Sequence, residues 1–462
     1  MAFRNCLVIK EKAMKAQGQE ILEGNISKGL IRLAIPIMAT SFLEMAYNLT
    51  DMFWIGNLSS KEVAAVGTAG YFPWLMMGLV TIPRIGAEAL IARSIGQKNE
   101  ENRRGYIAAV LQMSIIMGLF YSFFVYLNSG WLLNIFQIRE TDVVQMAGQY
   151  LKIIVFGLIF AFLNPVFTGT FNAHGQSKLP FYFNTAGLVV NMILDPILIF
   201  GWLGLPKMGV EGAALATVIA QMTVSVCFVI FMLRDKDEFS QIPILQIRWN
   251  RWRRVLVIGT PAAVQGILFT LISVALARII TVWGAAAIAV QKVTAQIEAI
   301  SWRSAQGFGT ALTAYVGQNY GAQKNERVKA SYRSAVSKGT AIGVLSTVLL
   351  ALFPQILLAP FFYEPEVLEM GIHCMRIMSV CQMFMSTEII TAGGFNGLGR
   401  TLPPSIVGII FTGMRIPLAM LLASFMGLDG VWWSMTISSV VKGLILPSWF
   451  YFGAYRKLKQ LS

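Results

Sequence analysis

The chain has 462 residues, of which 56% are hydrophobic and only 13% are charged. A water-soluble protein carries roughly twice that share of charged residues, so the composition excludes an ordinary soluble fold. The formal charge of +14 would suit a nucleic-acid partner, but the lysines and arginines gather in loops between apolar stretches, so we expect no such partner. The two histidines and four cysteines lack metal-ligand spacing, which argues against a metalloenzyme.

Apolar stretches of 18 or more residues recur along the chain and predict an all-α polytopic membrane protein. We expect twelve transmembrane helices, at about 28–56, 63–93, 104–128, 143–170, 179–202, 209–233, 252–282, 286–316, 328–353, 367–396, 403–426 and 429–453. Basic residues concentrate in both tails and in alternate loops, which predicts that both termini lie in the cytoplasm. The first residues do not have the pattern of a cleavable signal peptide.

The first predicted span is unusual because it carries two carboxylates. An ionised carboxylate in hydrocarbon costs several kcal/mol, so the polar face of this span must lie against protein or a water-filled cavity. Pro36 removes a backbone donor and should kink the helix. Two interpretations follow, the coupling helix of a transporter or a polar packing seam between helices. The residues expected on this face are Thr40, Glu44, Tyr47, Asn48 and Asp51.

The fifth predicted span carries a further acid, Asp195. Helical spacing puts Asn184 and Asn191 on the same face as this acid. Pro196 follows directly and leaves backbone carbonyl groups available as ligands. This face is therefore a second candidate for ion binding.

Depth along the membrane predicts that three helices meet at one level. At 1.5 Å per residue, Asp51 and Asp195 both lie about 8–9 Å below the outer ends of their spans, and Thr217 of the sixth span lies at a similar depth. Two carboxylates in a pocket of low dielectric cannot both stay ionised cheaply, so one takes a proton or a cation neutralises the pair. We therefore expect H⁺ or Na⁺ as the coupling ion and no other cofactor. The candidate Na⁺ ligands are Asp51, Asn191, Asp195 and Thr217.

An internal repeat divides the chain into halves. Four landmarks return in the same order at offsets of 218–225 residues: Pro36 as Pro261, Gly96-Gln97 as Gly317-Gln318, Phe171-Asn172 as Phe395-Asn396, and Gly209 as Gly427. Each half holds six predicted spans, an even number, so we expect two six-helix bundles related by a pseudo-two-fold axis along the membrane normal. The predicted divisions are a cytoplasmic tail (1–27), an N-lobe (28–233), a linker (234–250), a C-lobe (251–455) and a second tail (456–462).

The second half lacks a matching acid pair. Leu276 and Pro417 stand near the corresponding positions, and this half offers Arg278 and Arg415 instead. Other charged residues inside the spans have spacings that suggest pairs within one helix, namely Arg84 with Glu88 and Glu298 with Arg303. The candidate residues of a substrate cavity are Glu44, Asn164, Asn184, Gln265 and Glu388.

Taken in order, these landmarks resemble those of the multidrug and toxic-compound extrusion (MATE) transporters over nearly the whole chain. The residues that carry the resemblance are Pro36, Asp51-Met-Phe-Trp-Ile-Gly56, Ala64-Ala-Val-Gly67, the two Gly-Gln turns, Asn191-Met-Ile-Leu-Asp195-Pro196 and Gly209-Val-Glu-Gly212. The resemblance implies a multidrug antiporter of the inner (plasma) membrane that exports bulky, mostly cationic or aromatic compounds in exchange for H⁺ or Na⁺. In the prokaryotic branch with acids in the first lobe, the implied coupling site maps onto Asp51, Asn191, Asp195 and Thr217. We expect Tyr47, one turn before Asp51, to join them.

The chain departs from the family pattern at one place, and other functions have to be weighed against multidrug export. One branch of the family uses an acid in the seventh span. This chain has Gln265 and Thr270 in that span, so coupling in the second lobe is not expected. A flippase for lipid-linked saccharides, from the same superfamily, is the alternative within transport, although such proteins tend to have fourteen spans and a basic cavity. An intramembrane enzyme would need a converging nucleophile and base, and a receptor or scaffold would not explain two buried acids at one depth. We expect a monomeric, non-enzymatic transporter in the lipid bilayer.

Overall fold

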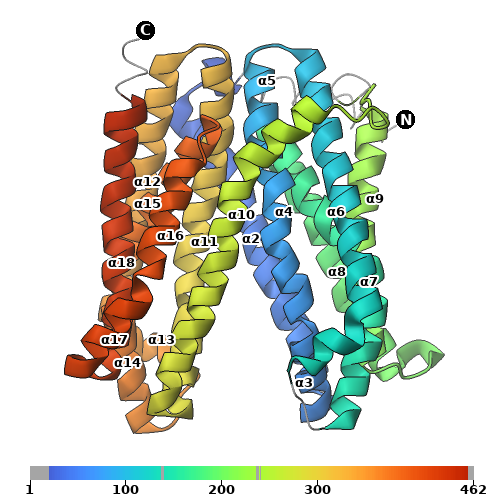
Figure 1. The fold of residues 1–462 in the computed structure, drawn as a ribbon, viewed down its shortest axis with the longest axis vertical. Helices are drawn as coiled ribbons and strands as arrows, with labels where there is room; N and C mark the ends of the chain where they lie inside the picture. Colours follow the sequence, from blue (N-terminus) through green and yellow to red (C-terminus); the bar gives the residue numbers. More distant parts are fainter. Residues whose placement is uncertain (1–19, 137–139, 236–238, 240, 456–462) are drawn as a thin grey trace. The chain divides into compact units, whose positions relative to one another are not determined.

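The computed structural model describes residues 20–136, 140–235, 239 and 241–455, and within these ranges the secondary structure is helical, without β-strands (Figure 1). In the first half of the chain the helices are α2 (Ile26–Gly56), α3 (Ser60–Ala69), α4 (Tyr71–Gly86), η1 (Ala87–Ile91), α5 (Ala92–Gly96), α6 (Glu100–Asn134), α7 (Thr141–Ala173), α8 (Lys178–Phe200), η2 (Trp202–Gly204) and α9 (Val210–Arg234). In the second half they are α10 (Trp249–Ile280), η3 (Thr281–Trp283), α11 (Ala285–Gly321), α12 (Asn325–Leu352), α13 (Pro354–Leu358), α14 (Pro365–Ser379), α15 (Gln382–Gly397), α16 (Leu402–Gly413), α17 (Arg415–Met426), α18 (Leu428–Trp449) and η4 (Phe450–Tyr455).

Nine helical stretches of the described chain are long and apolar enough to cross a membrane, which agrees with the predicted polytopic α-helical class. Three further predicted spans correspond to α11, to α14 with α15, and to α18. These three contain charged residues that are buried among neighbouring helices, such as Glu298, Glu388 and Lys442, each less than 9% exposed. Buried charged residues lower the mean hydropathy of α11 and α18, whereas the tenth span is divided into two helices of 15 and 16 residues, each too short to cross a membrane alone.

Several predicted spans are interrupted rather than continuous. The second span consists of α3, α4, the π-helical turn η1 and α5, the tenth is divided between α14 and α15, and the eleventh is divided at Met414 between α16 and α17. Gly201 ends α8 with a φ of 77°, a left-handed conformation that glycine adopts without strain. The predicted tails fall largely outside the described residues, which exclude 1–19 and 456–462.

The helices form two compact units. The N unit holds residues 39–91 and 99–259, and the C unit holds 20–38, 92–98 and 260–455 of the described chain. Helices α2 and α10 each continue from one unit into the other, close to Pro36 and Pro261. The lobe boundaries expected from the repeat, with a linker at 234–250, remain a prediction.

The core of the N unit lies between α3, α4, α6, α7 and α9. Apolar side chains of α7 form its centre, among them Leu151 and Phe162, which have no exposed surface. Met76 of α4 and Ala214 of α9 pack against the same cluster. Burying a large apolar side chain contributes about 1.5–3 kcal/mol, so these contacts supply the stability on which the polar site of this unit depends.

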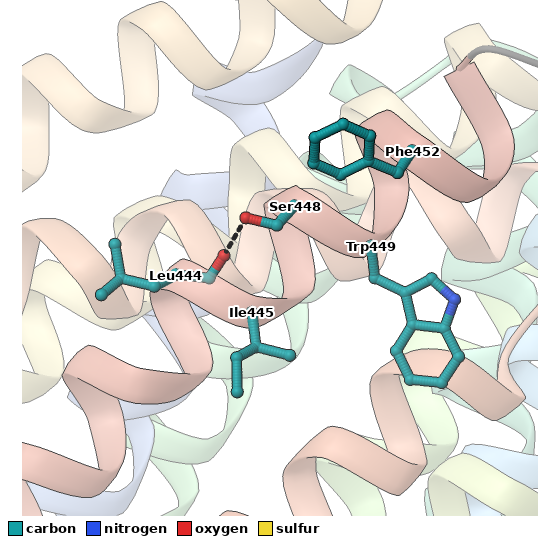
Figure 2. A pocket seen from close by; sticks show the side chains of 5 residues that line it. All are labelled: Leu444, Ile445, Ser448, Trp449 and Phe452. Carbon is teal, nitrogen blue, oxygen red and sulfur yellow. Dashed lines mark hydrogen bonds between the residues drawn. The ribbon is translucent and has the colours of Figure 1, made fainter.

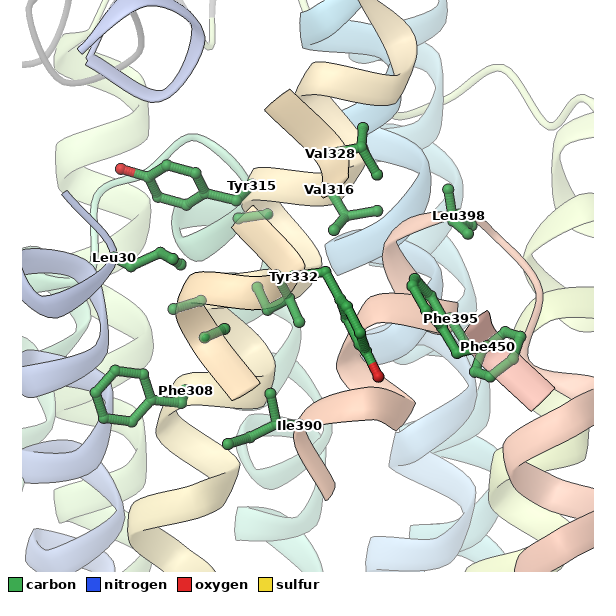
Figure 3. Packing of buried hydrophobic residues seen from close by; sticks show 14 of the residues in the cluster. Leu30, Phe308, Tyr315, Val316, Val328, Tyr332, Ile390, Phe395, Leu398 and Phe450 are labelled. Carbon is green, nitrogen blue, oxygen red and sulfur yellow. The ribbon is translucent and has the colours of Figure 1, made fainter. Parts of the chain in front are cut away.

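The core of the C unit centres on α11 and the helices around it. Figure 3 shows Tyr315, Phe308 and Val316 of α11 beside Tyr332 of α12 and Phe450 of η4, all members of one buried cluster. Tyr332 and Phe450 stack with ring centroids 4.1 Å apart. The whole cluster buries twenty-two residues, and it ties the first turns of α2 to this unit through Leu30 and Leu33.

Helices α11 and α15 approach each other closely at a pair of glycines. A β-carbon on Gly393 would overlap the backbone of Gly309, so only glycine fits at this crossing. The hydroxyl of Thr313 in α11 donates across the crossing to the carbonyl of Gly393 at 3.0 Å. The close approach brings polar side chains of α11 and α15 within hydrogen-bonding distance of each other.

Candidate functional site

Three helices of the N unit bring the predicted coupling residues together. Helix α2 carries Tyr47 and Asp51 one turn apart, α8 carries Asn191 and Asp195 one turn apart, and α9 contributes Thr217. The one-turn spacing places both residues of each pair on the same helix face. The depth of these residues in the membrane, expected from the lengths of the spans, remains a prediction.

Asp195 is the best-buried acid of the group. Asn191 has no exposed surface and Asp195 is 1% exposed, and the amide Nδ2 of Asn191 donates to Asp195 Oδ1 at 3.2 Å. Asp51, which is partly buried, lies next to both of these residues and interacts electrostatically with Asp195. The two carboxyl groups therefore share one low-dielectric environment.

Tyrosine and threonine hydroxyl groups complete the surroundings. Tyr47 lies beside Thr217 and close to both acids. Tyr150 of α7 also lies close enough to Asp51 and Asp195 to interact with them electrostatically, and it is 8% exposed. Tyr150 cannot be identified from the sequence, because a lone tyrosine in an apolar span has no motif that sets it apart from a packing residue.

Four oxygen atoms of this group are buried and lack a hydrogen-bond partner within the described chain: Tyr47 Oη, Asp51 Oδ1, Asn191 Oδ1 and Asp195 Oδ2. Buried polar atoms normally have hydrogen-bond partners, so these four oxygen atoms are suited to bind a proton, a water molecule or a cation. Two carboxylates, an amide oxygen and hydroxyl groups form an all-oxygen donor set, which suits a hard cation such as Na⁺ as well as a shared proton. We refer to these residues, with Thr217, as the acid-pair site.

The sequence model of the MatE family matches residues 36–197 and 261–421, more than half of the chain. The chain belongs to the MatE family. The two matched segments begin 225 residues apart, at 36 and 261, so the internal repeat expected from the landmarks is also found by the family comparison. The resemblance to MATE transporters is confirmed.

Named relatives and solved structures match this MatE protein over most of their length. The probable multidrug resistance protein NorM of Thermotoga maritima is 27% identical over 436 residues, or 94% of each chain. The probable multidrug resistance protein YoeA of Bacillus subtilis is 25% identical and covers 90% of this chain and 92% of its own. A crystal structure of MATE in complex with MaD3S has a TM-score of 0.89 at 23% identity, over 96% of this chain and 99% of that one. The predicted fold class, twelve transmembrane helices in two bundles, is that of the MATE structures.

Some residues proposed for the substrate cavity of this MatE protein take part in helix packing. Asn164 of α7 is buried, and its Nδ2 donates to the Gln221 carbonyl at 3.0 Å and to Gln221 Oε1 at 2.8 Å. The hydroxyl of Ser225 donates to Asn164 Oδ1 at 2.6 Å. Asn184 donates to the Pro180 carbonyl in its own helix at 2.7 Å. Asn164 is thus held in the α7–α9 interface, with both ends of its amide engaged.

The other cavity candidates lie in different surroundings. Glu44 is exposed on α2, whereas Gln265 of α10 is partly buried and packs against Gly408 of α16. Glu388 of α15 is 8% exposed and forms an ion pair with Lys442 of α18, with Oε2 and Nζ 3.1 Å apart. Lys442 cannot be recognised as the partner of Glu388 from the sequence, because 54 residues separate the two and no helical spacing links them.

The structure confirms one of the two predicted pairs within single helices. Arg84 Nε and Glu88 Oε1 are 3.2 Å apart, as expected at i,i+4. The predicted pair of Glu298 with Arg303 is wrong, because Glu298 Oε1 instead accepts a hydrogen bond from Gln382 Nε2 of α15 at 2.8 Å. Residues five apart point about 140° away from each other around a helix, so Arg303 faces away from Glu298.

An apolar groove lies outside the acid-pair site. It occupies about 430 Å³ on α18 and η4 and is lined by Leu444, Ile445, Ser448, Trp449 and Phe452 (Figure 2). Its one hydroxyl, Ser448 Oγ, donates to the Leu444 carbonyl at 2.7 Å. The lining therefore offers apolar contact and no charged group, which makes this groove unsuitable for binding the coupling ion.

Proposed function

We propose that this MatE transporter is a secondary active multidrug exporter that moves bulky, mostly cationic or aromatic compounds out of the cell in exchange for H⁺ or Na⁺. The proposal rests on the acid-pair site, where Asp51 and Asp195 share one buried environment. Four oxygen atoms of this site have no hydrogen-bond partner among the described residues. The relatives named as probable multidrug resistance proteins support the class of substrate. No enzymatic step is required for this activity.

The acid pair would couple the ion to the export cycle through differential affinity. Two carboxylates in one pocket repel each other when both are ionised, so the pair binds a proton or a cation most tightly in the state where they lie close together. An ion can shift a conformational equilibrium only by as much as its affinities for the two states differ. Occupancy of the site by H⁺ or Na⁺ would therefore favour one state of the transporter and drive release of the exported compound.

The decisive experiment measures transport in reconstituted vesicles. Efflux of a fluorescent organic cation is followed under separately imposed pH and Na⁺ gradients, for the wild type and for Asp51→Asn and Asp195→Asn. Asp142→Asn is the matched control, because the Asp142 side chain is 68% exposed and pairs with Lys61 on the surface of the N unit. We expect one gradient to drive wild-type and control transport, and both acid-pair variants to lose that dependence.

Each other outcome of this experiment has a definite meaning. If the wild type follows a gradient and both acid-pair variants still follow it, the coupling site lies elsewhere and the proposal for the acid pair is wrong. If neither gradient moves an organic cation, the exporter proposal fails, and lipid-linked substrates become the next candidates because of the related flippases.

We also propose that both termini are cytoplasmic, that the protein resides in the inner membrane and that it acts as a monomer. The support for the topology is the excess of lysine and arginine in alternate loops, since such residues stay on the cytoplasmic side. Fusion of a reporter that fluoresces only in the cytoplasm to the C-terminus should give a bright signal. Fusion of a phosphatase that is active only outside the cytoplasm should give none.

A further inference from the structure

Arg415 is a buried cation that no anion of the described residues contacts. It is 6% exposed at the start of α17, in the C unit. Its Nε donates to Ser438 Oγ at 2.6 Å, and its Nη2 donates to Ser439 Oγ at 2.9 Å. Both acceptors are neutral hydroxyl groups of α18, and in the described part of the chain no carboxylate lies within ion-pair distance of the guanidinium. A guanidinium has five N–H donors, so three have no acceptor among the residues that the structure describes.

The nearby acids have other partners. Glu388 is paired with Lys442 at 3.1 Å, which leaves that pair neutral. Glu298 accepts its hydrogen bond from the neutral amide of Gln382. Both acids act on Arg415 electrostatically without touching it. The charge of Arg415 is therefore only partly balanced, and an ionised residue within a membrane span normally pairs with another charge or faces a substrate pathway.

An aromatic side chain lies next to the guanidinium. The carbon Cζ of Arg415 is 5.9 Å from the ring centroid of Phe269 on α10. Phe269 is 48% exposed, so the buried arginine lies close to a surface that another molecule can reach. A cation with free forked donors beside an exposed aromatic ring has the two features needed to bind an aromatic carboxylate.

We propose that Arg415 binds the carboxylate group of a transported compound, and that Phe269 packs against the aromatic part of the same compound. The free N–H groups of a guanidinium match the two oxygens of a carboxylate in a bidentate arrangement, which a lysine cannot reproduce. The inference rests on the proposed export function and deepens it, because it names the residues that would distinguish carboxylate-bearing substrates from other aromatic compounds. Cations without a carboxylate would not use this subsite.

The test uses two dyes that share one fluorophore, a rhodamine with a free benzoate and the methyl ester of the same dye. Binding to the purified full-length protein in detergent is measured by fluorescence anisotropy, so that the result does not depend on ion coupling. Arg415→Gln should weaken binding of the free acid by about 10- to 100-fold, the range expected for one or two charge-assisted hydrogen bonds, and leave the ester unchanged. Arg278→Gln is the matched control, since Arg278 is an exposed arginine of the same unit.

Two further variants separate recognition from a structural role. Arg415→Lys keeps the charge but loses the fork, so its affinity for the free acid should fall between those of the wild type and Arg415→Gln. Glu298→Gln removes a carboxyl group that acts electrostatically on Arg415, and at a pH where that carboxyl is ionised it should tighten binding of the free acid while the ester stays the same. If Arg415 only compensates the charge of Glu298, neither variant will change the ratio of acid to ester affinity.

The outcomes of this test distinguish the inference from the proposed function. Equal loss of acid and ester binding in Arg415→Gln, or loss of neither, overturns the inference. Wild-type binding of the ester without binding of the acid also overturns it, but leaves the exporter proposal intact. Binding of neither dye counts against both. If Arg415→Gln does not fold, the opposite shifts expected for Arg415→Lys and Glu298→Gln decide the question.

Discussion

Replacing Lys442 by methionine should destabilise the C unit, because it would leave the carboxylate of Glu388 buried without its counter-charge. The two side chains are 8% and 10% exposed, and their charged atoms are 3.1 Å apart. Removing one partner of a buried ion pair costs about 3–5 kcal/mol, mostly the penalty of the remaining desolvated charge. Methionine is unbranched and apolar, so it can fill most of the space of the lysine stem.

The double variant Lys442→Met with Glu388→Gln distinguishes the charge effect from loss of packing. With both charges removed, no uncompensated charge stays buried, and the double variant should recover most of the stability lost by the single variant. We therefore expect a coupling energy of about 2–4 kcal/mol between the two positions, larger than the few tenths typical of independent sites.

The assay is equilibrium unfolding, followed by circular dichroism in one detergent, of the wild type, the single variants Lys442→Met and Glu388→Gln, and the double variant. Lys292→Met serves as the control, because Lys292 is an exposed lysine on α11 of the same unit and its replacement should change stability by less than about 0.5 kcal/mol. Two results would contradict this prediction: Lys442→Met lowers the free energy of unfolding no more than Lys292→Met, or the effects of the two single variants simply add in the double variant. In either case the buried ion pair does not stabilise the C unit.

Two more predictions concern close packing and the linker. Gly393→Ala should cost about 1–3 kcal/mol of stability, because its β-carbon would overlap the backbone of α11, whereas Gly266→Ala on α10, with no atom within 4 Å of the added carbon, should be neutral or stabilising. The reverse order in a thermal-unfolding comparison would show that the α11–α15 crossing is not tight. Arg248 and Arg251 contact Glu101 Oε1 at 2.7 and 3.1 Å. Glu101→Gln should therefore lower the free energy of unfolding by under about 1 kcal/mol, but it should speed trypsin cleavage within the linker. Added salt should also speed this cleavage in the wild type, because it screens the ion pairs. An unchanged cleavage time course would refute this role of the pairs.

The acid pair could be located from the sequence because its geometry depends on local helical spacing. Asp51 and Asp195 each lie one turn from a polar neighbour, and the length of each span sets their depth. The same reasoning failed for Glu298, since the i,i+5 spacing to Arg303 does not place the two side chains on one face. Tyr150 could not be identified either, because which side of α7 faces the acids depends on how α7 packs.

The sequence by itself determined the membrane class, the order of the spans and the repeat, because hydropathy, loop charge and recurring glycines and prolines are properties of neighbouring residues. Only the tertiary structure decided that Glu388 meets Lys442, that Gln382 reaches Glu298, and that Arg415 is left with neutral partners. These contacts join helices far apart in the chain. They depend on which helix faces pack together, and that choice is made by many weak contacts across the whole unit, such as the glycine crossing of α11 and α15, rather than by any local pattern.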